Sequence, residues 1–115
     1  MTPLLAEGVE LFNSGRYWEA HEVWEREWTP DRMGPDSGFY KGLIQVAAGC
    51  LHYTRRNRRG ALNKWRSGAD YLRPYLPAHK DLRLAPLVGT VDGFLSAMTE
   101  GGWPELKMPI IRVAS

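Results

Sequence analysis

The stretch EAHEVWEREW, residues 19–28, comes within one position of a zinc-protease motif. In H-E-x-x-H, two histidines at i and i+4 are metal ligands on one helix face, and the glutamate between them is the general base. Here His21 and Glu22 are in place, but Glu25 stands where the second histidine would be. Imidazole and carboxylate both suit Zn, Mn or Fe, although two ligands are too few. One hypothesis is therefore a hydrolase-like metal-dependent enzyme with ligands His21, Glu25 and His52 and with Glu22 as its base.

Helical geometry divides this stretch into two groups of side chains. An apolar, mostly aromatic stripe recurs at i, i+3, i+7 and i+11 and predicts the buried face of a helix: Tyr17, Ala20, Trp24 and Trp28. His21 falls inside this stripe with Glu25 at its edge, whereas Glu22 faces the other side. That separation disfavours a protease, because the base must reach the metal-bound water.

A second interpretation places the polar residues of this helix in the core. Gln45 and His52 lie seven residues apart on one face of a later helix, so they are expected to complete a network with His21, Glu22 and Glu25. Buried networks of this kind must be fully satisfied and can fix which helix faces which. The same groups could instead hydrogen-bond a small polar ligand in a pocket. Either arrangement would have an aromatic lining of Tyr17, Trp24 and Trp28.

Four arginines in five residues form the third candidate site. Arg55, Arg56, Arg58 and Arg59 could grip a phosphate or carboxylate, or contact nucleic acid. The whole chain carries 15 Lys and Arg against 13 Asp and Glu, a net charge of +2, which is a smaller surplus than nucleic-acid binding usually shows. The alternative is a solvated turn whose cations favour the preceding helix end.

The elements that must position these groups are all predicted to be helices. Helical periodicity recurs along the chain and no strand pattern competes with it. Proline and glycine clusters bound five expected helices, at about 3–13, 17–28, 37–57, 61–75 and 84–98. The third is apolar nearly all round, which indicates a central helix, and Gly42, Ala48 and Gly49 would let its neighbours approach closely. We therefore expect an all-α, single-domain bundle over residues 1–115, with residues 1–2 as its N-terminal end and 99–115 as an extended C-terminal tail.

Composition bounds the class of protein. The single cysteine, Cys50, excludes an intrachain disulfide and is typical of a buried small side chain. Neither a signal peptide nor an apolar run long enough to span a membrane is recognisable, so we expect a soluble, cytoplasmic protein. No cofactor is expected apart from the divalent metal of the first hypothesis. Trp103, Ile110 and Ile111 are too apolar to remain exposed to solvent, so we expect them to pack on the bundle or on a second subunit. Self-association through the tail or an aromatic surface is therefore a further expectation.

Residues of these candidate sites also form a recognisable pattern. An Asn-x-Gly-x-aromatic start precedes an Ala-His-Glu-x-Trp-Glu helix, then Gly-Leu-Ile-Gln with a downstream histidine, and an Asn-x-x-Gly-Ala turn. The residues that carry it are Asn13, Gly15, Tyr17, Ala20, His21, Glu22, Trp24, Glu25, Trp28, Gly42, Leu43, Ile44, Gln45, His52, Asn57, Gly60 and Ala61. Over about residues 12–75 the chain resembles the small bacterial and archaeal family catalogued as domain of unknown function 309. It departs at Arg56, where the family usually has glycine.

The resemblance implies an all-α bundle with a tetratricopeptide-like helical hairpin, and it implies no activity. The hypothesis that the sequence favours is a non-enzymatic binding or interaction module with a polar His/Glu/Gln network in its core. The metal-dependent enzyme and the anion-binding or nucleic-acid-binding protein are the alternatives.

Overall fold

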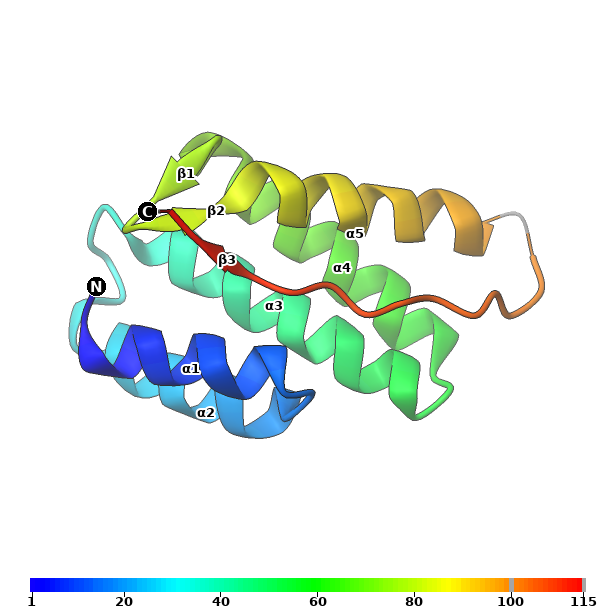
Figure 1. The fold of residues 1–115 in the computed structure, drawn as a ribbon, viewed down its shortest axis with the longest axis horizontal. Helices are drawn as coiled ribbons and strands as arrows, with labels where there is room; N and C mark the ends of the chain where they lie inside the picture. Colours follow the sequence, from blue (N-terminus) through cyan, green and yellow to red (C-terminus); the bar gives the residue numbers. More distant parts are fainter. Residues whose placement is uncertain (100, 115) are drawn as a thin grey trace.

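The chain folds as a helical bundle with one very small sheet (Figure 1). The computed structural model describes residues 1–99 and 101–114, and the two remaining residues of the expected tail, 100 and 115, lie outside the described part. Its elements are α1 (Pro3–Asn13), α2 (Tyr17–Trp28), η1 (Thr29–Asp31), α3 (Ser37–Thr54), α4 (Arg58–Leu72), η2 (Arg73–Tyr75), β1 (Ala78–His79), β2 (Leu82–Arg83), α5 (Leu84–Thr99) and β3 (Arg112–Val113). The prediction of an all-α fold with about five helices is confirmed.

The first two helices form the predicted hairpin because each has a defined start and stop. The Thr2 hydroxyl accepts a hydrogen bond from the Leu5 amide at 3.2 Å and caps α1, whose first residue is Pro3. Gly15 turns the chain with φ +81°, a left-handed conformation that glycine adopts without steric cost. Pro30 then follows the end of α2, so α2 has the bounds that the sequence predicts.

Helix α3 lies at the centre and packs against α2 on one side and α4 on the other. Its glycines allow the close approach to α4 that was expected. A Cβ atom on Gly49 would lie 2.3 Å from Trp65 Cδ1, and one on Gly42 would lie 2.5 Å from Leu72 Cγ. Both Trp65 and Leu72 are fully buried. The two helices therefore meet where neither could accept a larger side chain without moving.

The rest of the core gathers around large aromatic side chains. Trp24 is fully buried, and its indole N–H donates to the Leu5 carbonyl at 3.3 Å. Gly8 on α1 makes room for this ring, since a Cβ there would lie 2.1 Å from Trp24 Nε1. Phe12 packs against Trp24 with ring centroids 6.0 Å apart. Helices α1 and α2 are thus joined by one buried tryptophan.

The turn between α3 and α4 differs from the one predicted. α3 ends at Thr54 and α4 begins at Arg58, whereas the sequence indicated an end near Asn57 and a start near Ala61. Arg56 adopts φ +56°, the conformation that suits the glycine usual in the resembled family. Asn57 then caps α4, because its side-chain oxygen accepts from the Gly60 amide at 3.0 Å.

The small sheet was not predicted, and it fixes the end of the tail. Strands β1, β2 and β3 pair antiparallel in that order. Just before β3, the Asn13 side chain accepts from the Ile111 amide at 2.7 Å and donates to the Ile111 carbonyl at 2.9 Å. Figure 1 shows the tail running back between α5 and α1. Trp103 stacks on Tyr53 at 5.0 Å and Ile111 is buried, while Ile110 remains 49% exposed.

Among the described residues, no helix is both long and apolar enough to cross a membrane.

Candidate functional site

His21 lies beside the exposed tryptophan Trp18 on α2, one turn away. The two rings stack with centroids 5.2 Å apart and an angle of 11° between their planes. Trp18 is 52% exposed, and the His21 side chain is half-buried beside it. The Nδ1 atom of His21 is buried and has no hydrogen-bond partner within the described residues. Such an unsatisfied group costs roughly 1–3 kcal/mol, so the structure leaves hydrogen-bonding capacity unused here.

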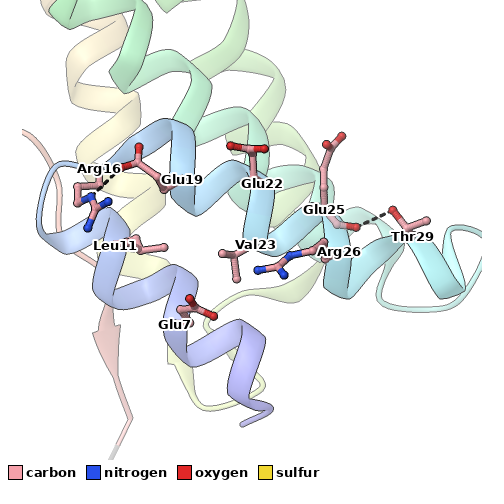
Figure 2. A pocket seen from close by; sticks show the side chains of 9 residues that line it. All are labelled: Glu7, Leu11, Arg16, Glu19, Glu22, Val23, Glu25, Arg26 and Thr29. Atoms are coloured by element: carbon pink, nitrogen blue, oxygen red, sulfur yellow. Dashed lines mark hydrogen bonds and ion pairs between the residues drawn. The ribbon is translucent and has the colours of Figure 1, made fainter.

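Glu22 and Glu25 line an open hollow of about 670 Å³ between α1 and α2 (Figure 2). The residues around it come from both helices and the turns beside them: Glu7, Leu11, Arg16, Glu19, Glu22, Val23, Glu25, Arg26 and Thr29. In Figure 2 the carboxylates of Glu22 and Glu25 point away from α1, whereas Glu7 and Arg26 lie on the side of α1. Arg16 donates to Glu19 at 2.6 Å, and this bond holds the pKa of Glu19 below its ordinary value.

Gln45 and His52 do not join His21 in a buried network. Within residues 1–99 and 101–114 no hydrogen bond connects any two of the five expected members, and no charged or polar residue is fully buried. The Nδ1 atom of His52 instead lies 3.1 Å from the Nδ2 atom of Asn57, and the His52 ring packs over Gly60. The reason is rotational: Lys41, Gln45, Ala48 and His52 recur at i, i+4, i+7 and i+11 on the half-buried stripe of α3.

These stripes meet on one surface, which we call the three-helix face. Lys41 Nζ lies 5.7 Å from the Trp28 ring on α2 and 5.4 Å from the Tyr71 ring on α4, so the stripe of α3 runs between those helices. No member is fully buried. The members are Trp18, His21, Glu25 and Trp28 of α2, Lys41, Gln45, Ala48 and His52 of α3, and Gly60, Lys64, Ser67 and Tyr71 of α4.

The expected aromatic lining is mostly core. Tyr17 and Trp24 are buried against Phe12, and burial followed by the influence of Cys50 raises the pKa of Tyr17 to about 12. Trp28 is half-buried at the edge of the three-helix face, where it donates to Ser37 Oγ at 3.3 Å. Tyr17 and Trp24 therefore act in packing, and only Trp28 is placed to contact another molecule.

No set of metal ligands is formed by the residues of the first hypothesis. Within the described ranges, three or more His, Cys, Asp or Glu side chains are nowhere grouped as metal ligands would be. His21, Glu25 and His52 are thus not such a set in this structure. Cys50 is buried, and burial raises its pKa to about 12, which disfavours the reactive thiolate. Metal-dependent catalysis stays a prediction.

Two of the four turn arginines are engaged by the chain itself. Arg58 donates to the Met98 carbonyl at the end of α5. The guanidinium of Arg56 lies 5.2 Å from the centre of the Trp103 ring, and that of Arg58 lies 5.8 Å from it. An open hollow of about 500 Å³ beside Arg56 is lined also by Tyr53, Thr54, Trp103 and Glu105. Arg55 and Arg59 are exposed, and anion binding by this turn stays a prediction.

Among the residues of the three-helix face that sequence reasoning missed are Trp18, Lys41 and Tyr71. Trp18 was not singled out because it falls outside the buried stripe of α2, yet its i, i+3 spacing from His21 was a readable signal. Lys41 and Tyr71 belong to different helices, so their proximity depends on the packing of α3 against α4 and has no local signal.

Comparison with known proteins identifies a family. The chain matches the family described as "Domain of unknown function (DUF309)" over residues 5–63, just over half of its 115 residues. The matched residues, 5–63, lie further toward the N-terminus than the region of resemblance noted in the sequence, about 12–75. The match includes most of α1, all of α2 and α3, and the start of α4. No curated protein matches the chain.

Proposed function

The chain belongs to the DUF309 family, and we propose that it is a non-enzymatic binding module whose contact surface is the three-helix face. The observation that carries this proposal is the pair formed by Trp18 and His21. A large ring that is more than half exposed covers an imidazole whose buried nitrogen has no partner among the described residues. Tryptophan is enriched among residues that dominate binding energy, because it contributes a large apolar area at low entropic cost.

The surroundings of this pair support binding of a macromolecule. The face combines half-buried polar groups, Gln45 and His52, with the partly exposed rings of Trp28 and Tyr71. Aromatic groups among polar ones are typical of protein interfaces. A hollow of about 670 Å³ between α1 and α2 borders the face at Glu25.

Photo-crosslinking tests the proposal. Replacement of Trp18 by p-benzoylphenylalanine keeps an aromatic ring within the expected contact surface. The matched control carries the same group at Ile110 in the tail, because Ile110 is 49% exposed and Trp18 is 52% exposed. Irradiation of cells that express each variant should give one discrete adduct from position 18 and none from position 110. No adduct from position 18, or equal adducts from both positions, would refute the proposal.

A further inference from the structure

We infer that the chain has a second contact surface, which binds the phosphate backbone of a nucleic-acid duplex. Four exposed arginines form this surface, two in the turn before α4 and two on α4 itself: Arg55, Arg56, Arg59 and Arg66. We call them the arginine surface. The inference goes beyond the proposed function, because none of the four belongs to the three-helix face. It is argued from the charge along the chain, the residues exposed around the arginines and the contacts of Trp103.

The net charge of the chain is the sum of a strongly basic segment and an acidic remainder. Residues 37–69 hold seven Lys and Arg and no Asp or Glu, a net charge of +7. The remainder holds the other eight Lys and Arg and all 13 Asp and Glu, a net charge of −5. Exposed charges further apart than about 10 Å are largely screened at 0.1 M salt, so a ligand responds mainly to the local surplus. The charge that a phosphate backbone would meet at the arginine surface is therefore much higher than the +2 of the whole chain.

The positive charge of the arginine surface is not neutralised by the chain itself. Within residues 1–99 and 101–114, no carboxylate forms an ion pair with any of the four arginines. Asp70 lies one turn beyond Arg66, but it accepts a hydrogen bond from Arg73 at 3.1 Å. Glu105 lines the hollow beside Arg56 without such a bond to it. The guanidinium groups are thus available to an anionic ligand.

The side chains exposed around the arginines are all polar. Between residues 54 and 70 the exposed residues are Thr54, Arg55, Arg56, Asn57, Arg59, Asn63, Arg66 and Asp70. No large apolar side chain is exposed in this range. A protein interface usually has an apolar or aromatic centre, and a membrane-binding surface has apolar anchors, whereas nucleic-acid interfaces are polar and strongly positive. Arginine, asparagine and threonine are also the side chains that commonly donate to phosphate oxygens. The composition therefore favours a nucleic acid over an acidic protein or a membrane.

The contacts of Trp103 favour a duplex over a single strand. Proteins that bind single strands stack the bases on aromatic side chains. Trp103 lies beside Arg56, but Tyr53 stacks on it with ring centroids 5.0 Å apart, and the Arg56 guanidinium lies 5.2 Å from the centre of the same ring. A base would have to displace one of these groups. Phosphates of a duplex can be contacted without unstacking any base. The stacking also holds Arg56 in place, which reduces the entropy lost on binding.

The spacing of the arginines suits the phosphates of a duplex. Arg59 and Arg66 are seven residues apart, so they lie on one side of α4 and about 10 Å apart along its axis. A duplex carries one phosphate per about 1.7 Å of its axis, so roughly six phosphates pass along this length. The planar guanidinium can bind two phosphate oxygens at once. Four exposed arginines at these positions can therefore each reach a phosphate.

Fluorescence anisotropy with a labelled DNA duplex of about 20 base pairs, and with an RNA duplex of the same length, tests the inference. Both duplexes should bind, because DNA and RNA share the phosphates that are contacted. With four phosphate contacts, the logarithm of the association constant for DNA should fall against the logarithm of the salt concentration with a slope of about −3.6. The affinity should then drop on the order of a hundredfold between about 50 and 200 mM salt.

A triple variant locates the contacts. Arg55→Gln, Arg59→Gln and Arg66→Gln together remove three charges and retain Arg56, which packs on Trp103. The affinity of this variant for the DNA duplex should fall at least tenfold at about 50 mM salt, and the slope should change to about −0.9.

The matched control removes the same charge from exposed arginines elsewhere: Arg32→Gln, Arg83→Gln and Arg112→Gln. Strands β2 and β3 and the loop after η1 lie at the end of the bundle away from the turn before α4 (Figure 1). The control should keep the affinity within about threefold of that of the native chain, because its charges lie outside the contact.

Three results would overturn the inference. The first is that neither duplex binds the native chain at about 50 mM salt with protein at up to about 500 µM. The second is an equal loss of affinity in the two triple variants, which would mean that overall charge and not the arginine surface attracts the duplex. The third is a single strand or a poly-glutamate peptide that binds as tightly as the duplexes. The salt slope of the native chain tests the inference without any variant, so the result does not depend on the folding of the variants.

Discussion

Replacement of Gly49 by alanine should destabilise the protein, although alanine is the better helix former. The site is in the middle of α3, where Gly→Ala alone stabilises a helix by about 1 kcal/mol. The added Cβ would lie 2.3 Å from Trp65 Cδ1, more than an ångström inside van der Waals contact. Because Trp65 is fully buried, its ring cannot swing into solvent to make room. Overpacking of this kind costs typically about 1–3 kcal/mol, and more where the neighbour is rigid.

Helix α5 provides a matched control for the propensity term. Gly89 is also inside a helix, but a Cβ there would meet nothing within 4 Å. Gly89→Ala should therefore raise the free energy of unfolding by about 0.5–1 kcal/mol. Because Trp65 is rigidly held, we take an overpacking cost of about 2–3 kcal/mol. Less a propensity gain of about 1 kcal/mol, Gly49→Ala should lower the free energy of unfolding by about 1–2 kcal/mol.

Urea denaturation followed by far-ultraviolet circular dichroism measures the free energy of unfolding of both variants and of the native chain. Tryptophan fluorescence provides a second probe near the perturbed ring, and the two transitions should coincide if unfolding is two-state. If Gly49→Ala proves as stable as Gly89→Ala, the close approach of α3 to Trp65 is not a constraint and the reasoning fails.

Three further predictions concern the turn, the tail and the loop before α3. Arg56→Gly should be more stable than Arg56→Ala by about 1 kcal/mol in urea denaturation, because both lose the stacked guanidinium and only glycine suits the left-handed backbone at this position; equal stability would contradict this. Asn13→Ala should free Ile111 and speed proteolysis of the tail at least severalfold while α-helix content is unchanged, whereas an unaltered cleavage rate would show that the tail is held without Asn13. The hydrogen bond from His79 lowers the pKa of Asp36, so the stability that this pair contributes is present above the ordinary aspartate pKa of about 4 and is lost as the pH falls through the lower, folded value. Asp36→Asn should therefore flatten the acid limb of a melting-temperature profile, and an acid limb identical to that of the native chain would refute the assignment.

The helices were predictable because their signals are local. Gly15 and Pro30 bound α2, and the apolar spacing of Tyr17, Trp24 and their neighbours selects its buried side without reference to any other element. The ends of α3 and α4 were less well predicted, because Arg56 takes a left-handed conformation that a helix pattern does not indicate. The strands were missed since two-residue strands are too short to show a period of two.

The candidate site was only partly predictable, for a related reason. A helical wheel places His21 near the buried stripe, and the histidine is indeed half-buried. A helical wheel does not show which neighbouring helix packs against each side of α2. Here Gln45 and His52 lie on the half-buried stripe of α3, and His52 packs over Gly60. Whether a polar residue faces a core or a surface depends on the rotation of two helices about each other, which no single-helix pattern records.

The double hydrogen bond between Asn13 and Ile111 makes one side-chain amide behave as a peptide unit. It donates to the carbonyl and accepts from the amide of the same residue, as the neighbouring strand of a sheet would do. The amide proton of Ile111 is consequently protected from exchange with solvent by one side chain, 98 positions away along the chain. The hydrogen-exchange rate of this amide would therefore report local opening of the tail separately from global unfolding. It would give the free energy with which residues near Ile111 are held against α1.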